Sequence, residues 1–113
     1  MLGGTPISWL GLLGPYPMID AGNLPDGIVI SGNHQSRIFN LIFSSAWMRG
    51  LTIADSSGSA IEMFIGHLEL IDCVFRGNST AANGGALGIY DSYNTSANLV
   101  RCTFENNSAS GRG

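Results

Sequence analysis

The sequence contains no lysine and has little charge of either sign. Only 12% of its 113 residues are charged, and all five cations are arginine. Eight acids bring the formal net charge to −3, so no basic face is available to neutralise phosphates and we expect no nucleic-acid partner. No hydrophobic run approaches the roughly 18 residues of a membrane-spanning helix, so we expect no transmembrane segment in this chain.

Strong helix formers are also scarce, whereas Gly, Ser, Asn and Thr are abundant, and this composition excludes a helical bundle. Hydrophobic residues nevertheless reach 44%, which is enough for the core of one compact domain. Short β-branched or aromatic stretches at 28–30, 38–43 and 68–70 are bounded by Gly, Asn and Ser. They predict strands of about three to six residues.

A repeat organises the second half of the chain. Residues 46–53, 68–75 and 97–104 carry apolar residues at the same four places, with offsets of 22 and 29 residues. Alternation with a period of two is typical of a strand. The two residues that interrupt the alternation in the middle of each copy indicate a corner, after which the apolar side chains again point inward. The expected inward residues are Ala46, Met48, Leu51 and Ile53, then Leu68, Leu70, Cys73 and Phe75, then Ala97, Leu99, Cys102 and Phe104.

Polar stretches follow each copy, and Gly-rich starts at 58–61 and 84–87 lead into a third strand. Three short strands per turn with polar corners predict an all-β parallel β-helix of about four coils. We assign residues 18–113 to this repeat segment, with truncation expected at its C-terminal end, and residues 1–17 to a lead-in of unknown conformation. Open ends would expose strand edges, so end-to-end self-association is expected.

Two strings in these copies resemble a known family. Cys-Val-Phe-Arg-Gly-Asn at 73–78 and Cys-Thr-Phe-Glu-Asn-Asn at 102–107, with Gly-Gly-Ala-Leu at 84–87 between them, are similar to repeats of the polymorphic outer membrane proteins. Those repeats read Phe-x-x-Asn and Gly-Gly-Ala-[Ile/Leu/Val]. The copy at 46–61 departs from both patterns. The resemblance implies a right-handed parallel β-helix of a bacterial surface or secreted protein.

Stacking of coils would place equivalent residues side by side. Asn78 and Asn107 share one corner, where Asn tolerates left-handed backbone and its amide can bond to its neighbour one coil away. We interpret both as structural corner residues and not as ligands. Cys73 and Cys102 share an inward place, and we expect buried free thiols because their parallel Cβ directions make a disulfide unfavourable.

Matched places also hold opposite charges. Asp72 lies at the place of Arg101, and Arg76 at the place of Glu105, so stacking would set each acid beside a base. Sugar-acting β-helix enzymes instead gather several carboxylates on one outward face. Because the acids here are scattered, we assign no catalytic residue, no cofactor and no metal ligand.

One loop is a candidate for polar recognition. Tyr90, Asp91, Tyr93 and Asn94 could stack on a sugar and hydrogen-bond to it, although a solvated long turn is the simpler interpretation. The two histidines, His34 and His67, have no acidic or thiol cluster beside them in the predicted arrangement, so we expect surface or corner roles for both.

The favoured function is therefore a non-catalytic scaffold, extracellular or on a bacterial outer membrane. We expect its partners to be a polysaccharide or the surface of a host or neighbouring cell. The alternative is a fragment of a pectate-lyase-like polysaccharide lyase or a glycoside hydrolase whose catalytic coils lie outside this segment. Both classes use the same fold, so the fold alone cannot separate them. A β-sandwich binding module is a third reading, but it would need antiparallel hairpins.

Overall fold

The computed structural model describes residues 7–10, 18–22, 24, 27–42 and 45–111, without the side chains of residues 7–10, 18 and 91–94. Every element of regular structure in this part of the chain is a β-strand, and it holds no helix long and apolar enough to cross a membrane. The strands are β1 (Ile7–Leu10), β2 (Met18–Asp20), β3 (Ile28–Ser31), β4 (Phe39–Ile42), β5 (Ala46–Arg49), β6 (Leu51–Ala54), β7 (Ile61–Ile71), β8 (Val74–Arg76), β9 (Ser79–Thr80), β10 (Leu87–Val100), β11 (Thr103–Glu105) and β12 (Ser108–Ala109).

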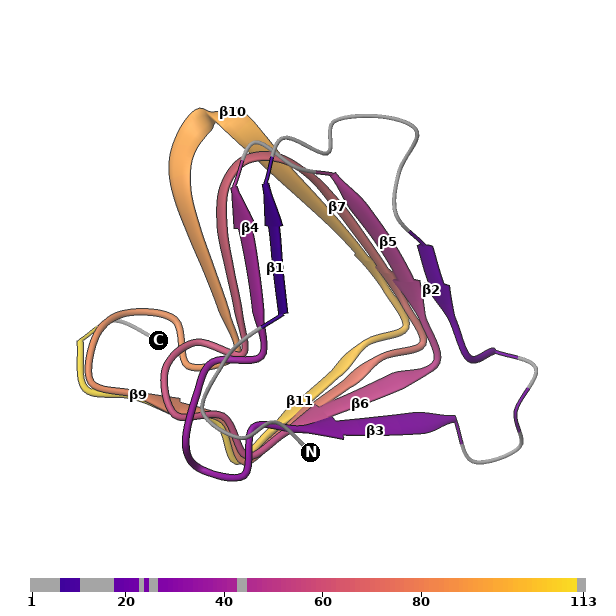
Figure 1. The fold of residues 1–113 in the computed structure, drawn as a ribbon, viewed down its shortest axis with the longest axis horizontal. Coiled ribbons are helices and arrows are strands. Elements are labelled where there is room, and N and C mark those ends of the chain that lie inside the picture. The colour runs from indigo at the N-terminus through magenta and orange to yellow at the C-terminus, as the bar shows by residue number, and fades with distance from the viewer. Residues whose placement is uncertain (1–6, 11–17, 23, 25–26, 43–44, 112–113) are drawn as a thin grey trace.

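All the strand pairs are parallel, and they form three sheets. Seen down the stack, the coils lie over one another around a three-sided interior (Figure 1). The two sides of the largest sheet are β1-β4-β7-β10 and β2-β5-β7-β10, and the third side is β3-β6-β8-β11. The predicted all-β parallel β-solenoid with three strands per coil is thus confirmed. It has about three turns and not four, because the four strands stacked on each side are separated by three turns of chain.

The predicted alignment of the repeat is confirmed by the strand register. Ala46 is paired with Leu68, which is paired with Ala97, and Ile53, Phe75 and Phe104 form another column. The offsets of 22 and 29 residues are therefore the lengths of two successive turns. β1 lies inside the lead-in at 1–17 and pairs with β4, so this part of the lead-in joins the stack.

Two strands are longer than the three to six residues predicted. β7 has 11 residues and β10 has 14, because each continues around the corner between two sides of the stack. At that corner Ile65 has a φ of 55°, and its N–H donates to the Thr95 hydroxyl 2.9 Å away in the next coil. Thr95 donates in turn to the Tyr90 carbonyl at 3.0 Å, so hydrogen bonding continues around the bend.

Left-handed backbone recurs at two corners. Gly50, Asp72 and Arg101 share one of them, with φ between 52° and 73°. At the other corner Gly77 and Asn106 have positive φ, whereas Asn78 and Asn107 do not. The left-handed conformation that we predicted for the two asparagines thus belongs to the residue before each of them.

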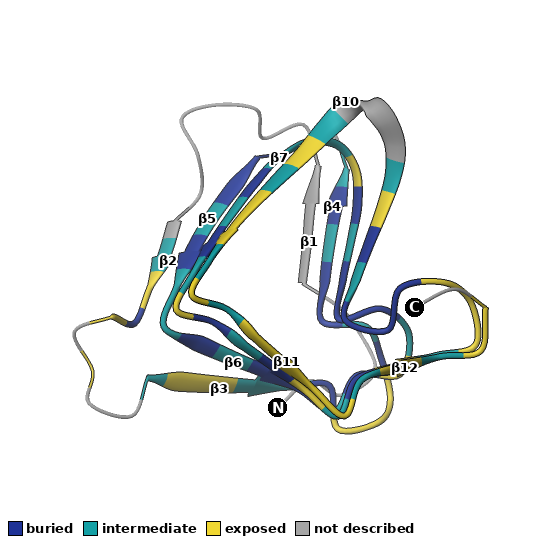
Figure 2. Cartoon of the chain, turned by 180° about the vertical axis from the view of Figure 1, so that it is seen from behind, coloured by how far each residue is buried: buried dark blue, intermediate teal, exposed yellow. Residues whose placement is uncertain are grey.

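The core fills the interior of the stack, and Figure 2 shows the buried residues on the middle coils. Leu70, Cys73 and Phe75 have no exposed surface, as predicted. Their counterparts in the last coil differ: Leu99 is 38% exposed, Phe104 is 45% exposed and Cys102 is half-buried. The prediction that Leu99 and Phe104 are core residues is wrong for this chain, because no described coil packs on that side of them.

Candidate functional site

The corner asparagines form a ladder of hydrogen bonds. The side-chain oxygen of Asn78 accepts from the Ser56 N–H at 3.1 Å, and its amide nitrogen donates to the Ile53 carbonyl at 2.9 Å. Toward the next coil, the backbone N–H and the side-chain amide of Asn78 both donate to Asn107 Oδ1, at 3.0 and 2.9 Å. The Asn107 amide donates to the Phe75 carbonyl at 2.9 Å. Each asparagine therefore joins its coil to the one before it.

The first predicted charge pair is formed. Arg101 donates from Nε to Asp72 Oδ1 at 2.6 Å and from Nη2 to Oδ2 at 3.2 Å. This bidentate contact is the main cause that holds the pKa of Asp72 below its ordinary value and raises that of Arg101. Both side chains are well exposed, so solvent screens the pair.

The second predicted pair is not an ion pair. Arg76 and Glu105 lie opposite each other in register, but among the described residues no salt bridge joins them. An ion pair that we did not predict joins Arg37 to Glu62 at 3.1 Å. Its two residues lie outside the aligned repeat, which explains why the alignment missed it.

A polar chain crosses the outward side of β7 and β10. His67 Nε2 lies 2.9 Å from Glu69 Oε1, and Nδ1 lies 2.7 Å from the Ser96 hydroxyl. His67 and Glu69 are two residues apart on one strand, so both point outward, and Ser96 is the register partner of His67. We expected no acidic or thiol cluster beside His67, and the structure places a single acid, Glu69, in contact with it. The repeat offset of 29 could have found the contact between His67 and Ser96.

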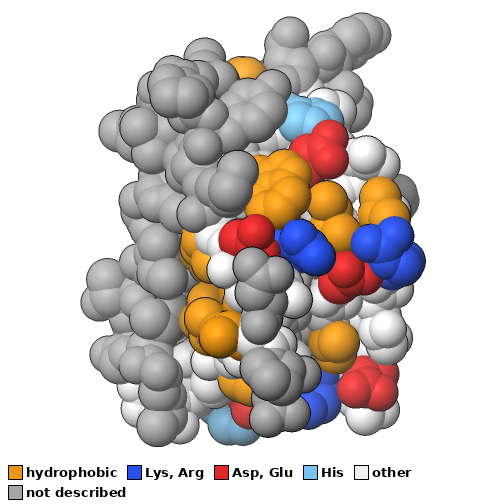
Figure 3. Space-filling view, turned by 90° about the vertical axis from the view of Figure 1, so that its right-hand side faces the viewer, with side chains coloured by type: hydrophobic (Ala, Val, Ile, Leu, Met, Phe, Trp, Pro, Cys, Tyr) orange, Lys and Arg blue, Asp and Glu red, His pale blue; other side chains and the backbone are white. Residues whose placement is uncertain are grey.

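These residues belong to a broader surface, which we call the outer face. It is the outward side of β5, β7 and β10, with Trp47, Glu69 and Asn98 in one register column beside the chain of His67 and Ser96. Figure 3 shows this side of the molecule, where a histidine lies next to an acidic side chain, and hydrophobic, acidic and arginine side chains follow. Trp47, His67 and Glu69 are all half-buried, so part of each side chain remains accessible.

The predicted ligand loop lies on a different side. Tyr90 belongs to β10 and stacks on Phe64 of the preceding coil, with ring centroids 4.8 Å apart and an angle of 16° between the rings. The side chains of Asp91, Tyr93 and Asn94 lie outside the described residues. The interpretation of 90–94 as a ligand loop therefore stays a prediction.

The remaining candidates are the two cysteines and His34. Cys73 and Cys102 are both free thiols, and burial raises the pKa of the Cys73 thiol. His34 is exposed in a turn, with its N–H bonded to the Asp55 carbonyl at 2.8 Å. Within the described part of the chain, no three His, Cys, Asp or Glu side chains are grouped so that they could hold a metal ion.

Comparison of the chain with models of protein families, with curated proteins and with solved structures finds no match in any of the three. The class defined by the fold and the geometry is that of a parallel β-solenoid with repeating coils.

Proposed function

We propose that this chain is part of a non-catalytic scaffold of a bacterial surface or secreted protein, similar to the polymorphic outer membrane proteins. The observation that carries the proposal is that polar side chains form hydrogen bonds and an ion pair between neighbouring coils. Asn78 and Asn107 bond to each other, and Asp72 is bound by Arg101 of the next coil. Amide and carboxylate groups serve as ligands in many sites, but the hydrogen bonds of Asn78, Asn107 and Asp72 are directed at neighbouring coils.

The outer face is the surface through which this scaffold binds a polysaccharide of a host or neighbouring cell. Trp47 offers an aromatic ring, and its register neighbours Glu69 and Asn98 offer a carboxylate and an amide. Sugars pack their apolar sides on aromatic rings and direct their hydroxyls to such polar groups. Successive strands repeat at about 4.8 Å, so polar groups recur at a regular spacing along the stack, which suits an extended polymer.

Retention of the protein on a panel of immobilised polysaccharides tests this function. Trp47→Ala should weaken binding about tenfold, a loss of about 1.4 kcal/mol. The matched control is Thr52→Ala, which changes a half-buried outward residue of β6 on another sheet and should leave binding unchanged. Retention of the Tyr90→Ala variant on the same polysaccharides tests the predicted ligand loop separately, because weaker binding by this variant would assign part of the binding to that loop. Equal binding by the Trp47 variant and the control would contradict the role of the outer face.

The same incubations test the non-catalytic assignment. No new reducing or unsaturated ends should form in the polysaccharide. Their release would contradict the scaffold and favour the fragment of a polysaccharide lyase or hydrolase. The location at the cell surface is tested by antibody labelling of intact cells, which should reach the protein without permeabilisation.

A further inference from the structure

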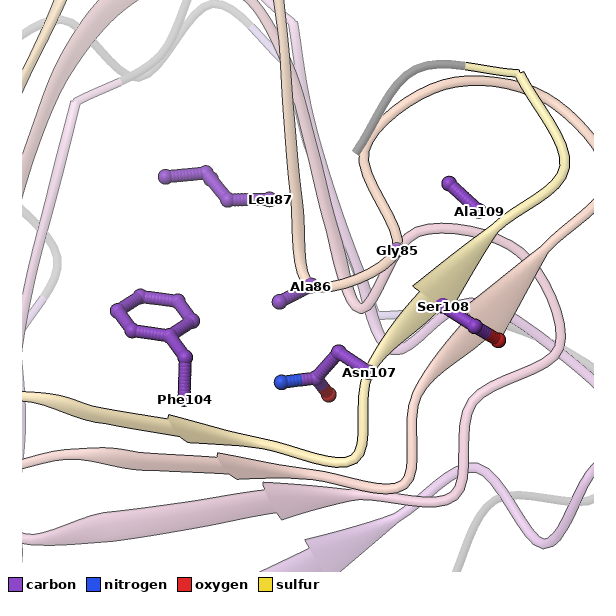
Figure 4. A pocket seen from close by; sticks show the side chains of 7 residues that line it. All are labelled: Gly85, Ala86, Leu87, Phe104, Asn107, Ser108 and Ala109. Carbon is purple, nitrogen blue, oxygen red and sulfur yellow. The ribbon is translucent and has the colours of Figure 1, made fainter.

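Hollows lie on two kinds of surface in the described part of the stack. One hollow lies at the C-terminal end, where Figure 4 shows Phe104 and Asn107 at its wall. Another, which we call the lateral hollow, has Gly22, Gly50 and Asp72 of three successive coils among its lining residues. It therefore lies along the side of the stack, and its exposure does not depend on where the stack ends.

Arg49 adjoins the lateral hollow at the end of β5, two residues after Trp47. Its side chain passes over Gly22, since a Cβ added to that glycine would lie 2.7 Å from Arg49 Cζ and 2.9 Å from Cδ. The hydrogen bond from Arg101 is the largest cause of the lowered pKa of Asp72, and the charge of Arg49 is a smaller one. The Arg49 guanidinium thus contacts one lining residue of the hollow and acts electrostatically on another.

Acidic and arginine side chains alternate across this side of the molecule (Figure 3). Asp72 is bound through two hydrogen bonds by Arg101. Asp20 is the register partner of Arg49, but its carboxylate accepts from the Gly22 N–H at 2.8 Å. Among the described residues, the half-buried Arg49 has no hydrogen-bond acceptor or ion-pair partner for its guanidinium. Its N–H donors are therefore available to an anionic group.

The outer face offers different groups on the two sides of Trp47. On one side, the His67 imidazole and the Ser96 hydroxyl are hydrogen-bonded to each other at 2.7 Å. On the other side is Arg49, whose Cα lies about 7 Å along β5 from that of Trp47. A sugar ring stacked on Trp47 with its hydroxyls toward Ser96 would direct a carboxylate on the same ring to Arg49. A guanidinium binds a carboxylate through two parallel N–H···O bonds.

We infer that the outer face selects an acidic polysaccharide, and that Arg49 binds the carboxylate of a sugar whose ring packs on Trp47. This inference rests on the proposed function, because it names the ligand class of the same surface. The net charge of −3 gives the chain no general attraction to a polyanion. A preference for an acidic polymer would therefore come from local contacts.

Equilibrium binding to hyaluronan and to alginate, each compared with its neutral carboxyl-reduced form, tests this inference. The intact chain should bind the acidic forms about tenfold more tightly than the neutral ones. Arg49→Gln should lose this preference and keep its affinity for the neutral forms. Arg49→Lys should retain only part of the preference, because an ammonium group cannot form the bidentate contact.

Two further variants separate charge from position. Arg76→Gln is the matched control, because it removes the same charge from an exposed residue of β8 on another sheet, and it should bind like the wild type. Gly22→Ala keeps every charge but displaces the Arg49 side chain, and should lower the preference several-fold. Circular dichroism of each variant verifies that it is folded.

The outcomes distinguish this inference from the proposed function. Equal affinity of the wild type for acidic and neutral forms, weakened by Trp47→Ala, would overturn the inference and leave the proposed function in place. A preference that persists in Arg49→Gln, or that Arg76→Gln lowers to the same extent, would overturn the inference too. Absence of binding to all four polymers would overturn both.

Discussion

Residues 68–78 and 97–107 carry the same pattern of apolar, charged and asparagine residues, and the strands pair them in register. Leu70 and Phe75 in the first segment have no exposed surface, whereas Leu99 and Phe104 in the second are among the exposed large hydrophobic residues. The two segments differ in their neighbours: in the part of the chain that the structure describes, the first has a coil on both sides, and the second has a coil on one side only.

This comparison shows how burial arises in a solenoid. A residue in a coil is covered largely by its counterparts in the coils before and after it, and much less by residues of its own coil. The same sequence pattern therefore contributes full burial in the middle of the stack and partial burial at its end. Substitutions at equivalent places in the two segments should therefore lower the free energy of unfolding by different amounts.

The phenylalanine column should give the largest difference in stability between equivalent substitutions in the two segments. Phe75→Asp would place an unpaired carboxylate in the core and should abolish folding, whereas Phe104→Asp should leave a folded protein with lowered stability. Phe75→Ala should cost about 3–5 kcal/mol, and Phe104→Ala less than half of that. Circular dichroism and thermal melts measure both pairs. A folded Phe75→Asp variant with unchanged β-sheet signal would refute its inward position.

The asparagine ladder should give the second-largest difference in unfolding free energy between equivalent substitutions. Asn78→Ala removes the acceptor of the Ser56 N–H and the donor to the Ile53 carbonyl, and should cost about 2–4 kcal/mol because buried polar groups lose their partners. Asn107→Ala should cost about 1–2 kcal/mol, since its surroundings admit water. Urea unfolding at constant pH measures both. Equal costs would mean that the ladder is no better formed between the middle coils than at the end.

The Asp72–Arg101 pair should give the smallest effect and a pH dependence of defined sign. Asp72→Asn keeps a residue type that tolerates the positive φ of 54°, and should lower the melting temperature by no more than about 4 °C. Because Arg101 lowers the pKa of Asp72 in the folded state, the stabilisation is present above the ordinary Asp pKa of about 4 and is lost as the pH falls through the lowered value.

Melts of the wild type and the Asp72→Asn variant between about pH 2 and pH 7 follow this loss. The difference in melting temperature should be constant above about pH 5 and vanish in stronger acid. It should also shrink in high salt. A difference that persists in acid would show that the ion pair is not its cause.

The sequence was informative wherever one coil repeats another. The alternation in 68–75 and 97–104 was enough to predict the inward columns, the register and the Asp72–Arg101 pair, because stacking converts a repeat offset directly into contact. The pattern wrongly predicted that Leu99 and Phe104 are buried, because their exposure depends on the number of described coils and not on the pattern within one coil. It also missed the His67–Glu69 contact, because a side-chain rotamer decides whether two outward neighbours meet.

Alkylation of the two thiols in the folded, dilute protein tests most directly whether position in the stack sets burial. Cys73 is fully buried between two coils and burial raises the pKa of its thiol, whereas Cys102 occupies the same inward place one coil later and is half-buried. Mass spectrometry should find Cys102 modified under native conditions, with Cys73 protected until the protein unfolds. Modification of both at one rate, or of Cys73 first, would contradict the account.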